Sequence, residues 1–249
     1  MSSRAVLRVC VAASVVVLVT GCGSSSPNAS PGGGSSSTPP ASSPTATPSS
    51  SAKPATVAEL KKIVLQPGDL PAGWKGKPYE ADPSDAAGSA AFVRCLGVRN
   101  TDPDKVAEAN SDDFDLGNAE ISSSADSYRS QSDLDVDIAI LHNPKAPACF
   151  KSQFSEGLIS SMPAGSKIDS ASVKIVPAAA GSPANLIATA NAAIKVTVQG
   201  QQVAVYVTSA FITGPLIEAE VDVFNIGAPV SASLVNSLAA TVAARAAKG

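Results

Sequence analysis

The sequence predicts an α+β fold in which helices pack on one face of a twisted antiparallel sheet. Apolar and polar residues alternate through four segments in the last third of the chain, which is typical of strands. Segments with the helical period of about 3.6 residues come before and after these strands. Because short turns of the hairpin type join successive strands, the sheet is predicted to be an antiparallel meander.

The chain begins with the features of a lipoprotein signal peptide. Two arginines precede an apolar run over residues 9–19, and the run ends in a lipobox, Val-Thr-Gly-Cys, over 19–22. Its 11 residues are too few to span a bilayer, which needs about 20. We expect removal of residues 1–21 and attachment of a diacylglyceryl group and palmitate to Cys22. The alternative is an ordinary secretory signal with a chance cysteine.

Residues 23–54 have the composition of a disordered linker. They are rich in Ser, Pro, Thr, Gly and Ala, with Lys53 as their one charge and no large apolar residue. The segment would reach about 100 Å as polyproline and about 30 Å as a random coil. It is interpreted as a spacer, and glycosylation of its Ser and Thr residues is an alternative role. Residues 55–249 are expected to form a single extracytoplasmic domain.

The charge of the chain excludes one large class of partner. Without residues 1–21 the chain has 16 basic and 21 acidic residues, a net charge of −5. Proteins that bind nucleic acid need clustered Lys and Arg, and the pair Lys61 and Lys62 fits the solvated face of a helix. We therefore expect no nucleic acid partner.

The first half of the domain carries signals for a short helix, a turn and a strand. A capping box over residues 56–59 (Thr-Val-Ala-Glu) opens a helix that stops before Gln66. Residues 69–74 (Asp-Leu-Pro-Ala-Gly-Trp) are rich in turn formers, and residues 119–129 have the pattern of a strand.

Two helices are predicted in the middle of the domain. Ser132 begins the first, with acids in its first turn and Leu134, Ile138 and Leu141 at helical spacing. The same stretch also alternates in the manner of a strand, and we prefer the helix because it has a cap and a proline terminator. A second amphipathic helix is predicted over 147–161.

The last third is predicted to be an antiparallel meander followed by a helix. The expected strands cover 167–176, 190–199, 202–213 and 216–224. Residues 200–201 (Gly-Gln) and 214–215 (Gly-Pro) suit the turns between them. Pro229 opens the final helix. One sheet face should be wet and the other covered.

The four cysteines separate by position. Cys10 leaves with the signal peptide and Cys22 takes the lipid, so Cys95 and Cys149 remain alone in an oxidising compartment. We expect them to form a disulfide that stabilises the fold by about 4 kcal/mol. A reactive thiol pair is the alternative, but the C-x-x-C spacing is missing.

The sequence contains no recognisable catalytic or metal motif. The single histidine, His142, lies at a predicted helix end, and a lone His excludes the usual zinc sites. The acids at 112, 113 and 115 fail the calcium-loop template and are interpreted as a surface loop. No Ser elbow or phosphate-binding Gly-rich loop occurs.

Two groups of residues remain as weak candidates for binding. Glu218, Glu220 and Asp222 line one face of a strand and could bind a cation or a basic partner, although we favour a solvated face. Trp74 and Tyr79, beside Gly and Pro, could form the rim of a ligand groove, although Trp is more often an anchor at the edge of a core.

Several of these segments together resemble a known group of proteins. They follow one another as in the small Ser/Pro-tethered lipoproteins of actinobacteria, mycobacteria especially. The segments are residues 69–74, 92–95 (Phe-Val-Arg-Cys), 120–124 (Glu-Ile-Ser-Ser-Ser) and 147–150 (Pro-Ala-Cys-Phe). More distantly, the chain is similar to extracellular sensor domains of the PknH type. That resemblance implies a helix-flanked sheet, disulfides and a ligand cleft. Those domains carry two disulfides, whereas this chain allows one and has no kinase.

The sequence therefore predicts a non-enzymatic binding or sensor-like domain, anchored by lipid on the extracytoplasmic face of the cell membrane. Its partner beyond the membrane would be a small molecule, a lipid or an envelope protein, and no cofactor or metal is expected. A carrier of an apolar envelope lipid or glycolipid is the alternative, and it needs a large apolar cavity. A cell-wall enzyme of unrecognised type comes third.

Overall fold

The computed structural model describes residues 52–81 and 85–248. The expected signal peptide, Cys22 and nearly all of the expected linker lie outside these described residues. Within the described ranges, no helix is both long enough and apolar enough to cross a membrane.

One antiparallel sheet of eight strands forms the centre of the domain. The strands are β1 Lys75–Lys77, β2 Lys105–Asn110, β3 Asp113–Leu116, β4 Ala119–Tyr128, β5 Lys167–Pro177, β6 Leu186–Val198, β7 Gln201–Gly214 and β8 Ile217–Ile226. Their order is β1-β3-β4-β8-β7-β6-β5, and β2 also pairs with β4. The first and last parts of the domain therefore meet in mid-sheet, where β4 pairs with β8 from Ala119 opposite Asn225 to Ser127 opposite Ile217.

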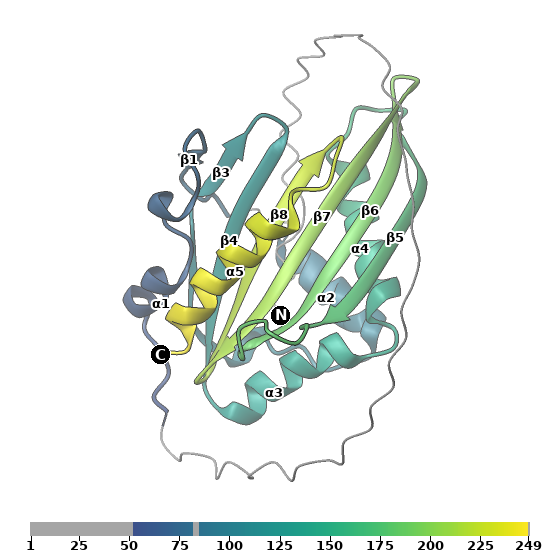
Figure 1. Ribbon diagram of the computed structural model, residues 1–249. Coiled ribbons are helices and arrows are strands. Elements are labelled where there is room, and N and C mark those ends of the chain that lie inside the picture. The colour runs from purple at the N-terminus through teal and green to yellow at the C-terminus, as the bar shows by residue number, and fades with distance from the viewer. Residues whose placement is uncertain (1–51, 82–84, 249) are drawn as a thin grey trace, which may run out of the picture. The chain divides into compact units, whose positions relative to one another are not determined.

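Five α-helices cover parts of both faces of this sheet (Figure 1). They are α1 Val57–Ile63, α2 Asp85–Leu96, α3 Gln131–Ala139, α4 Ala146–Ser160 and α5 Ala232–Ala246, with 3-10 turns η1 Pro67–Asp69, η2 Asp102–Asp104 and η3 Ile140–His142. The predicted α+β class with a large antiparallel sheet and one disulfide is confirmed. The expectation that helices pack on one face only is corrected, because α5 and α2/α4 lie on opposite faces.

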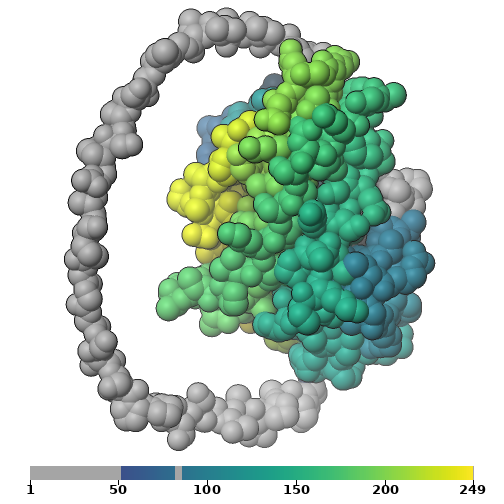
Figure 2. Space-filling view, turned by 90° about the vertical axis from the view of Figure 1, so that its right-hand side faces the viewer, coloured from purple at the N-terminus to yellow at the C-terminus, as the bar shows by residue number. Residues whose placement is uncertain are grey.

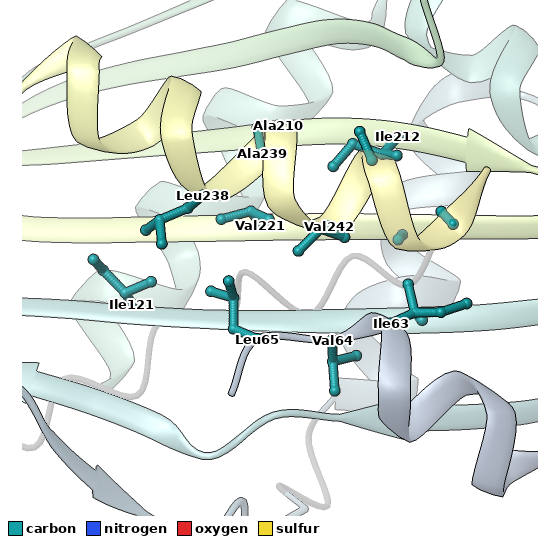
Figure 3. Close-up of a cluster of buried hydrophobic side chains, with 14 of the residues drawn as sticks. Ile63, Val64, Leu65, Ile121, Ala210, Ile212, Val221, Leu238, Ala239 and Val242 are labelled. Atoms are coloured by element: carbon teal, nitrogen blue, oxygen red, sulfur yellow. The ribbon is translucent and has the colours of Figure 1, made fainter. Parts of the chain in front are cut away.

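The first hydrophobic core lies between α1, α5 and one face of the sheet (Figure 3). Leu238 and Val242 of α5 pack over Val221 of β8, while Leu65, just after α1, lies beside Ile121 of β4. All five side chains are almost completely buried. This core fixes β4 and β8 as central strands.

The second hydrophobic core lies on the opposite face, under α2 and α4. An aromatic group joins its parts: the Phe150 ring centroid lies 4.6 Å from that of Phe92, 5.8 Å from that of Phe154 and 6.2 Å from that of Phe211. These residues come from α4, α2 and β7. The aromatic group therefore fixes both helices to the sheet.

Most of the predicted elements are confirmed. Thr56 caps α1 through a reciprocal capping box with Glu59, and β4 and α4 occupy the predicted segments. The segment that also had strand-like alternation forms helix α3, with Ser130 rather than Ser132 as its N-cap. Its hydroxyl accepts the backbone N–H of Asp133, which satisfies an otherwise free donor at the helix start.

The structure corrects several boundaries and adds elements that the sequence did not reveal. Gln199 and Gly200, with φ of 50° and 82°, form the β6–β7 turn, one residue earlier than predicted. The β7–β8 turn lies one residue later than predicted, at Pro215 and Leu216, because Gly214 pairs with Ile217. Helix α5 begins at Ala232, after the cap Ser231, rather than at Pro229. Strands β1–β3 and helix α2 were not predicted.

Candidate functional site

The disulfide expected from the sequence is present and joins two helices. Cys95 on α2 and Cys149 on α4 are bonded, with their Cα atoms 5.8 Å apart. Cys149 is buried, whereas Cys95 is exposed. The bond therefore fixes the separation of α2 and α4 beside the Phe92–Phe150 contact.

A groove of about 620 Å³ lies between these two helices; we call it the α2–α4 groove. It is lined by Ala87, Gly88, Ala91, Phe92, Arg94, Cys95, Cys149, Ser152, Gln153, Glu156, Gly157 and Ser160. Figure 2 shows α2 in blue and α4 in teal on the side of the molecule away from the yellow α5. Because Ala and Gly supply much of the lining, the two helices leave space between them instead of interlocking.

The polar groups of the groove come from both walls. On α4, the Ser152 hydroxyl donates to Glu156 Oε1 over 2.8 Å. On α2, Arg94 is exposed, and its guanidinium has no hydrogen bond or ion pair with the described part of the chain. Phe92 supplies apolar surface at the base. The groove can therefore receive a small molecule that has an anionic or hydrogen-bonding end and an apolar body.

The three acids of β8 are here called the β8 acid row. They belong to the sheet, on the face that carries the second hydrophobic core, and not to the α2–α4 groove. Glu218 and Glu220 are each only 5 % exposed, and Asp222 is partly buried. The expectation of a solvated face is therefore wrong. Tyr128 of β4 contacts Glu218, and Phe211, the cross-strand neighbour of Glu220, is buried and contacts Phe150 of α4.

A polar network surrounds Glu218, the first residue of the β8 acid row. The Tyr128 hydroxyl lies between two carboxyl groups: it is hydrogen-bonded to Asp137 of α3, and its oxygen lies 3.1 Å from Glu218 Oε2. Thr101 donates to the other oxygen of Asp137 over 3.0 Å. Helix α3 is thus linked to β8 through a buried tyrosine.

A second branch of this network contains a buried lysine. Lys105 Nζ lies 2.9 Å from Asp126 Oδ2 and 3.0 Å from Asp102 Oδ1. Asp126 stands opposite Glu218 in the β4–β8 register. Ser89 of α2 donates to Asp102 over 2.6 Å, so this branch reaches from the acid row to α2.

The environment raises the pKa values of two members of the row. For Glu220, burial is the main cause, followed by repulsion from Asp222 and Glu218, and together they raise its pKa well above the usual range. Burial also raises the pKa of Asp222 to about 6, although a hydrogen bond from Ser209 opposes this. Both carboxyls therefore favour the protonated form more than a free acid does.

The ion-paired branch behaves in the opposite way. Burial disfavours the charged form of Lys105, but Asp126 and Asp102 outweigh this effect and raise the pKa of the lysine. Burial would raise the pKa of Asp102, yet Lys105 and Ser89 hold it below its usual value. Burial, and then Glu218, raise the pKa of Tyr128, which keeps its proton. Lys105 and Asp102 therefore favour their charged forms, in contrast to Glu220 and Asp222, which favour the protonated form.

The remaining sequence candidates lie elsewhere. Trp74 is partly buried and packs against the first core, while Tyr79 is partly buried in the segment after β1. Neither lines the α2–α4 groove, nor the smaller hollow of about 240 Å³ beside α1, so their role in binding remains a prediction. His142 is exposed at the end of η3.

The acidic segment at 112–115 proves to be structural. It forms β3, and Asp115 makes an ion pair with Lys77 of β1, so it is a strand rather than the predicted loop. Across residues 52–81 and 85–248, no group of three or more His, Cys, Asp or Glu side chains is arranged to hold a metal ion.

The fold and groove define an α+β domain with a disulfide-clamped hollow on one face. No protein-family model matches the chain, and no similar sequence is found among curated proteins. Among solved structures, the chain is similar to the extracellular domain of PknH from Mycobacterium tuberculosis, with a TM-score of 0.41 and 9 % identity. The similarity covers 79 % of this chain and 99 % of that domain. A likeness this distant leaves the function to be argued from the chain's own residues.

Sequence reasoning did not find the groove or the network. The groove depends on α2, and residues 85–96 were not predicted to form a helix. Lys105, Asp126 and Asp137 lie far apart in the chain, and nothing in their local spacing indicates a shared buried cluster. The one available signal was the alternation of acids on β8. Whether those acids are buried depends on tertiary packing.

Proposed function

We propose that this chain is a lipid-anchored binding domain of the cell envelope, of the actinobacterial lipoprotein type and without enzymatic activity. Cys22 would carry the lipid, and residues 23–54 would hold the domain away from the outer surface of the cytoplasmic membrane. The lipobox and the composition of the linker support this placement.

The α2–α4 groove is the observation that carries the binding role. It is bounded by rigid elements, because the disulfide and the aromatic group fix both helices. Arg94 offers an uncommitted guanidinium, and guanidinium groups bind carboxylates and phosphates well. We therefore propose a ligand that is a small anionic molecule with an apolar part.

A titration with a paired set of probes tests this proposal. Phenyl phosphate carries an anionic group and an apolar ring, and phenol has the same ring without the anion. We expect phenyl phosphate to shift the amide NMR signals of α2 and α4, and phenol to do so more weakly. Arg94→Gln should weaken phenyl phosphate binding by about tenfold, which corresponds to one charge-assisted contact.

A groove-filling variant separates site binding from nonspecific binding. Ala91→Trp places a large ring in the groove at an exposed position and should abolish the shifts. Ala240→Trp, at an exposed position of α5 on the opposite face, is the matched control and should leave them unchanged. If phenyl phosphate acts equally on both variants, the groove is not the site.

The anchor and the carrier alternative have separate tests. Cys22→Ser should prevent incorporation of labelled palmitate and release the protein from membranes. Native mass spectrometry of the protein extracted from its own membranes addresses the carrier: a co-purifying lipid would favour that alternative over the binding role.

A further inference from the structure

The β8 acid row places like charges close together in a buried position. Successive members are two residues apart on one strand face, a spacing of about 7 Å. The neighbours of Glu220 are Ser124 on β4 and Phe211 on β7, and those of Asp222 are Ser122 and Ser209. None of these four neighbours carries a positive charge that could balance Glu220 or Asp222.

The other charged groups around Glu220 and Asp222 are mostly acids as well. They are Glu218 on β8, Asp126 on β4, Asp137 on α3, Asp102 on η2 and Lys105 on β2, together with the phenol of Tyr128 on β4. Lys105 is engaged at 2.9 Å and 3.0 Å by Asp126 and Asp102. The facing positions of α2 and α4 hold Ser89 and Phe150. Because a buried carboxylate without a cation is costly, such groups bind a proton instead.

We propose that the β8 acid row is a proton-operated switch, in which Glu220 and Asp222 hold protons in the folded domain under mildly acid conditions and release them to water as the external pH rises, loosening the packing of α4 against Phe211 of β7. The domain would thereby respond to acidity outside the membrane. This inference goes beyond ligand binding and does not depend on what the groove receives.

The aromatic group connects the β8 acid row to α2 and α4. Phe211 is the cross-strand neighbour of Glu220, and its ring contacts Phe150 of α4, which in turn contacts Phe92 of α2. An ionised Glu220 must draw water towards this contact to be solvated. The proton state of the row is therefore coupled to the packing of both groove walls.

The direction of the pH effect follows from the raised pKa values. A carboxyl whose folded pKa lies above its unfolded pKa stabilises the fold fully below the unfolded value, and this contribution is lost as pH rises through the folded value. For Asp222 the unfolded pKa is near 3.8 and the folded pKa is about 6. Glu220 adds to the effect in the same direction.

Denaturant unfolding of the full chain between pH 5 and pH 8 tests the switch. We expect the folding equilibrium constant to fall by about tenfold from pH 5 to pH 7 through Asp222 alone, with a further fall from Glu220. Glu220→Gln and Asp222→Asn imitate the protonated acids, so each should flatten the profile and raise stability at pH 8. Glu80→Gln, at an exposed glutamate, is the matched control and should retain the wild-type slope.

A spectroscopic measurement keeps the test valid if a variant does not fold. The infrared carbonyl band of protonated carboxylic acid should be present in the wild type at pH 6, decline as the pH is raised to 8, and lose intensity in each variant that folds. Protection factors for hydrogen exchange in α4, which are corrected for the intrinsic rise of the exchange rate with pH, should fall over the same range. Absence of the band at pH 6, or a slope that Glu220→Gln and Asp222→Asn leave unchanged, would overturn the proposal.

Discussion

The two faces of β8 are both covered by the fold, yet they are built from opposite chemistry. One face presents Ile217, Ala219, Val221 and Val223 to α1 and α5 and is apolar at these four positions. The other presents Glu218, Glu220 and Asp222 towards the side occupied by α2, α3 and α4. The apolar face is stabilised at every pH by removal of its side chains from water. The acidic face depends on hydrogen bonds and on bound protons.

The comparison shows that alternation along a strand identifies its two faces but not which of them is wet. For β6 the usual interpretation holds: Ile194 and Val196 are buried, while Ala193 and Lys195 are exposed. For β8 it does not, because this strand lies in mid-sheet and helices cover both of its sides. Four variants would break or sharpen the contrast, and they follow from the largest expected effect to the smallest.

Placing an acid on the apolar face should have the largest effect. Val221 is completely buried beneath Leu238 and Val242, which cannot donate hydrogen bonds (Figure 3). We expect Val221→Asp to cost more than about 4 kcal/mol at pH 7, measured by urea unfolding, because its carboxylate would be buried without a partner. Asp222→Asn, one residue away, is the control and should leave the fold intact. Equal stability of Val221→Asp and the wild type would contradict the contrast.

Removing the disulfide tests whether it holds α2 and α4 in place on the acidic side of the sheet. The bond closes a loop with a sequence separation of 54, so the double substitution Cys95→Ser and Cys149→Ser should destabilise the domain by about 4 kcal/mol. Thermal unfolding of this variant should match that of the wild type in reductant. We expect α2 and α4 to show faster hydrogen exchange than α5. Uniform acceleration in all three helices would argue against a local role.

Ser209→Ala removes the donor that favours the ionised form of Asp222. We expect a loss of about 1–2 kcal/mol at pH 7 and a smaller loss at pH 5, where Asp222 is mostly protonated. The measurement is the free energy of unfolding at the two pH values. Thr208→Ala, on the neighbouring residue of β7 that faces the other way, is the control and should show no such pH difference.

Asp69→Asn tests an ionic contact on the apolar side. Arg245 of α5 donates to both oxygens of Asp69, over 2.6 Å and 2.7 Å. Burial opposes the charged form of Asp69, but Arg245 and the backbone N–H of Gln66 outweigh it and lower its pKa.

Because that pKa is lowered, the contact stabilises the fold above about pH 4 and is lost as pH falls further. We expect Asp69→Asn to cost about 1 kcal/mol at pH 7 and little at pH 2.5, measured by denaturant unfolding. This pH dependence is opposite in sign to that of the β8 acid row. A cost that grows on acidification would contradict it.

The elements that were predicted correctly are those whose signals are local. The capping box at Thr56 and Glu59 fixes the start of α1, and the two-residue periods of β5–β8 fix the meander. Helix α2 was missed although its hydrophobic periodicity is as strong as that of α5, which was predicted. Strands β1–β3 were missed because they are short and obtain their hydrogen bonds from distant partners.

The sequence by itself determined the α+β class, the pairing of Cys95 with Cys149, and which residues of β8 share a face. These follow from periodicity, from side-chain alternation and from the elimination of the other cysteines. Only the tertiary structure decided that both faces of β8 are covered, that α2 and α4 enclose a groove, and that Lys105 joins the buried acids. The reason is physical: burial and charge pairing depend on which distant segments come into contact, and no local pattern records that.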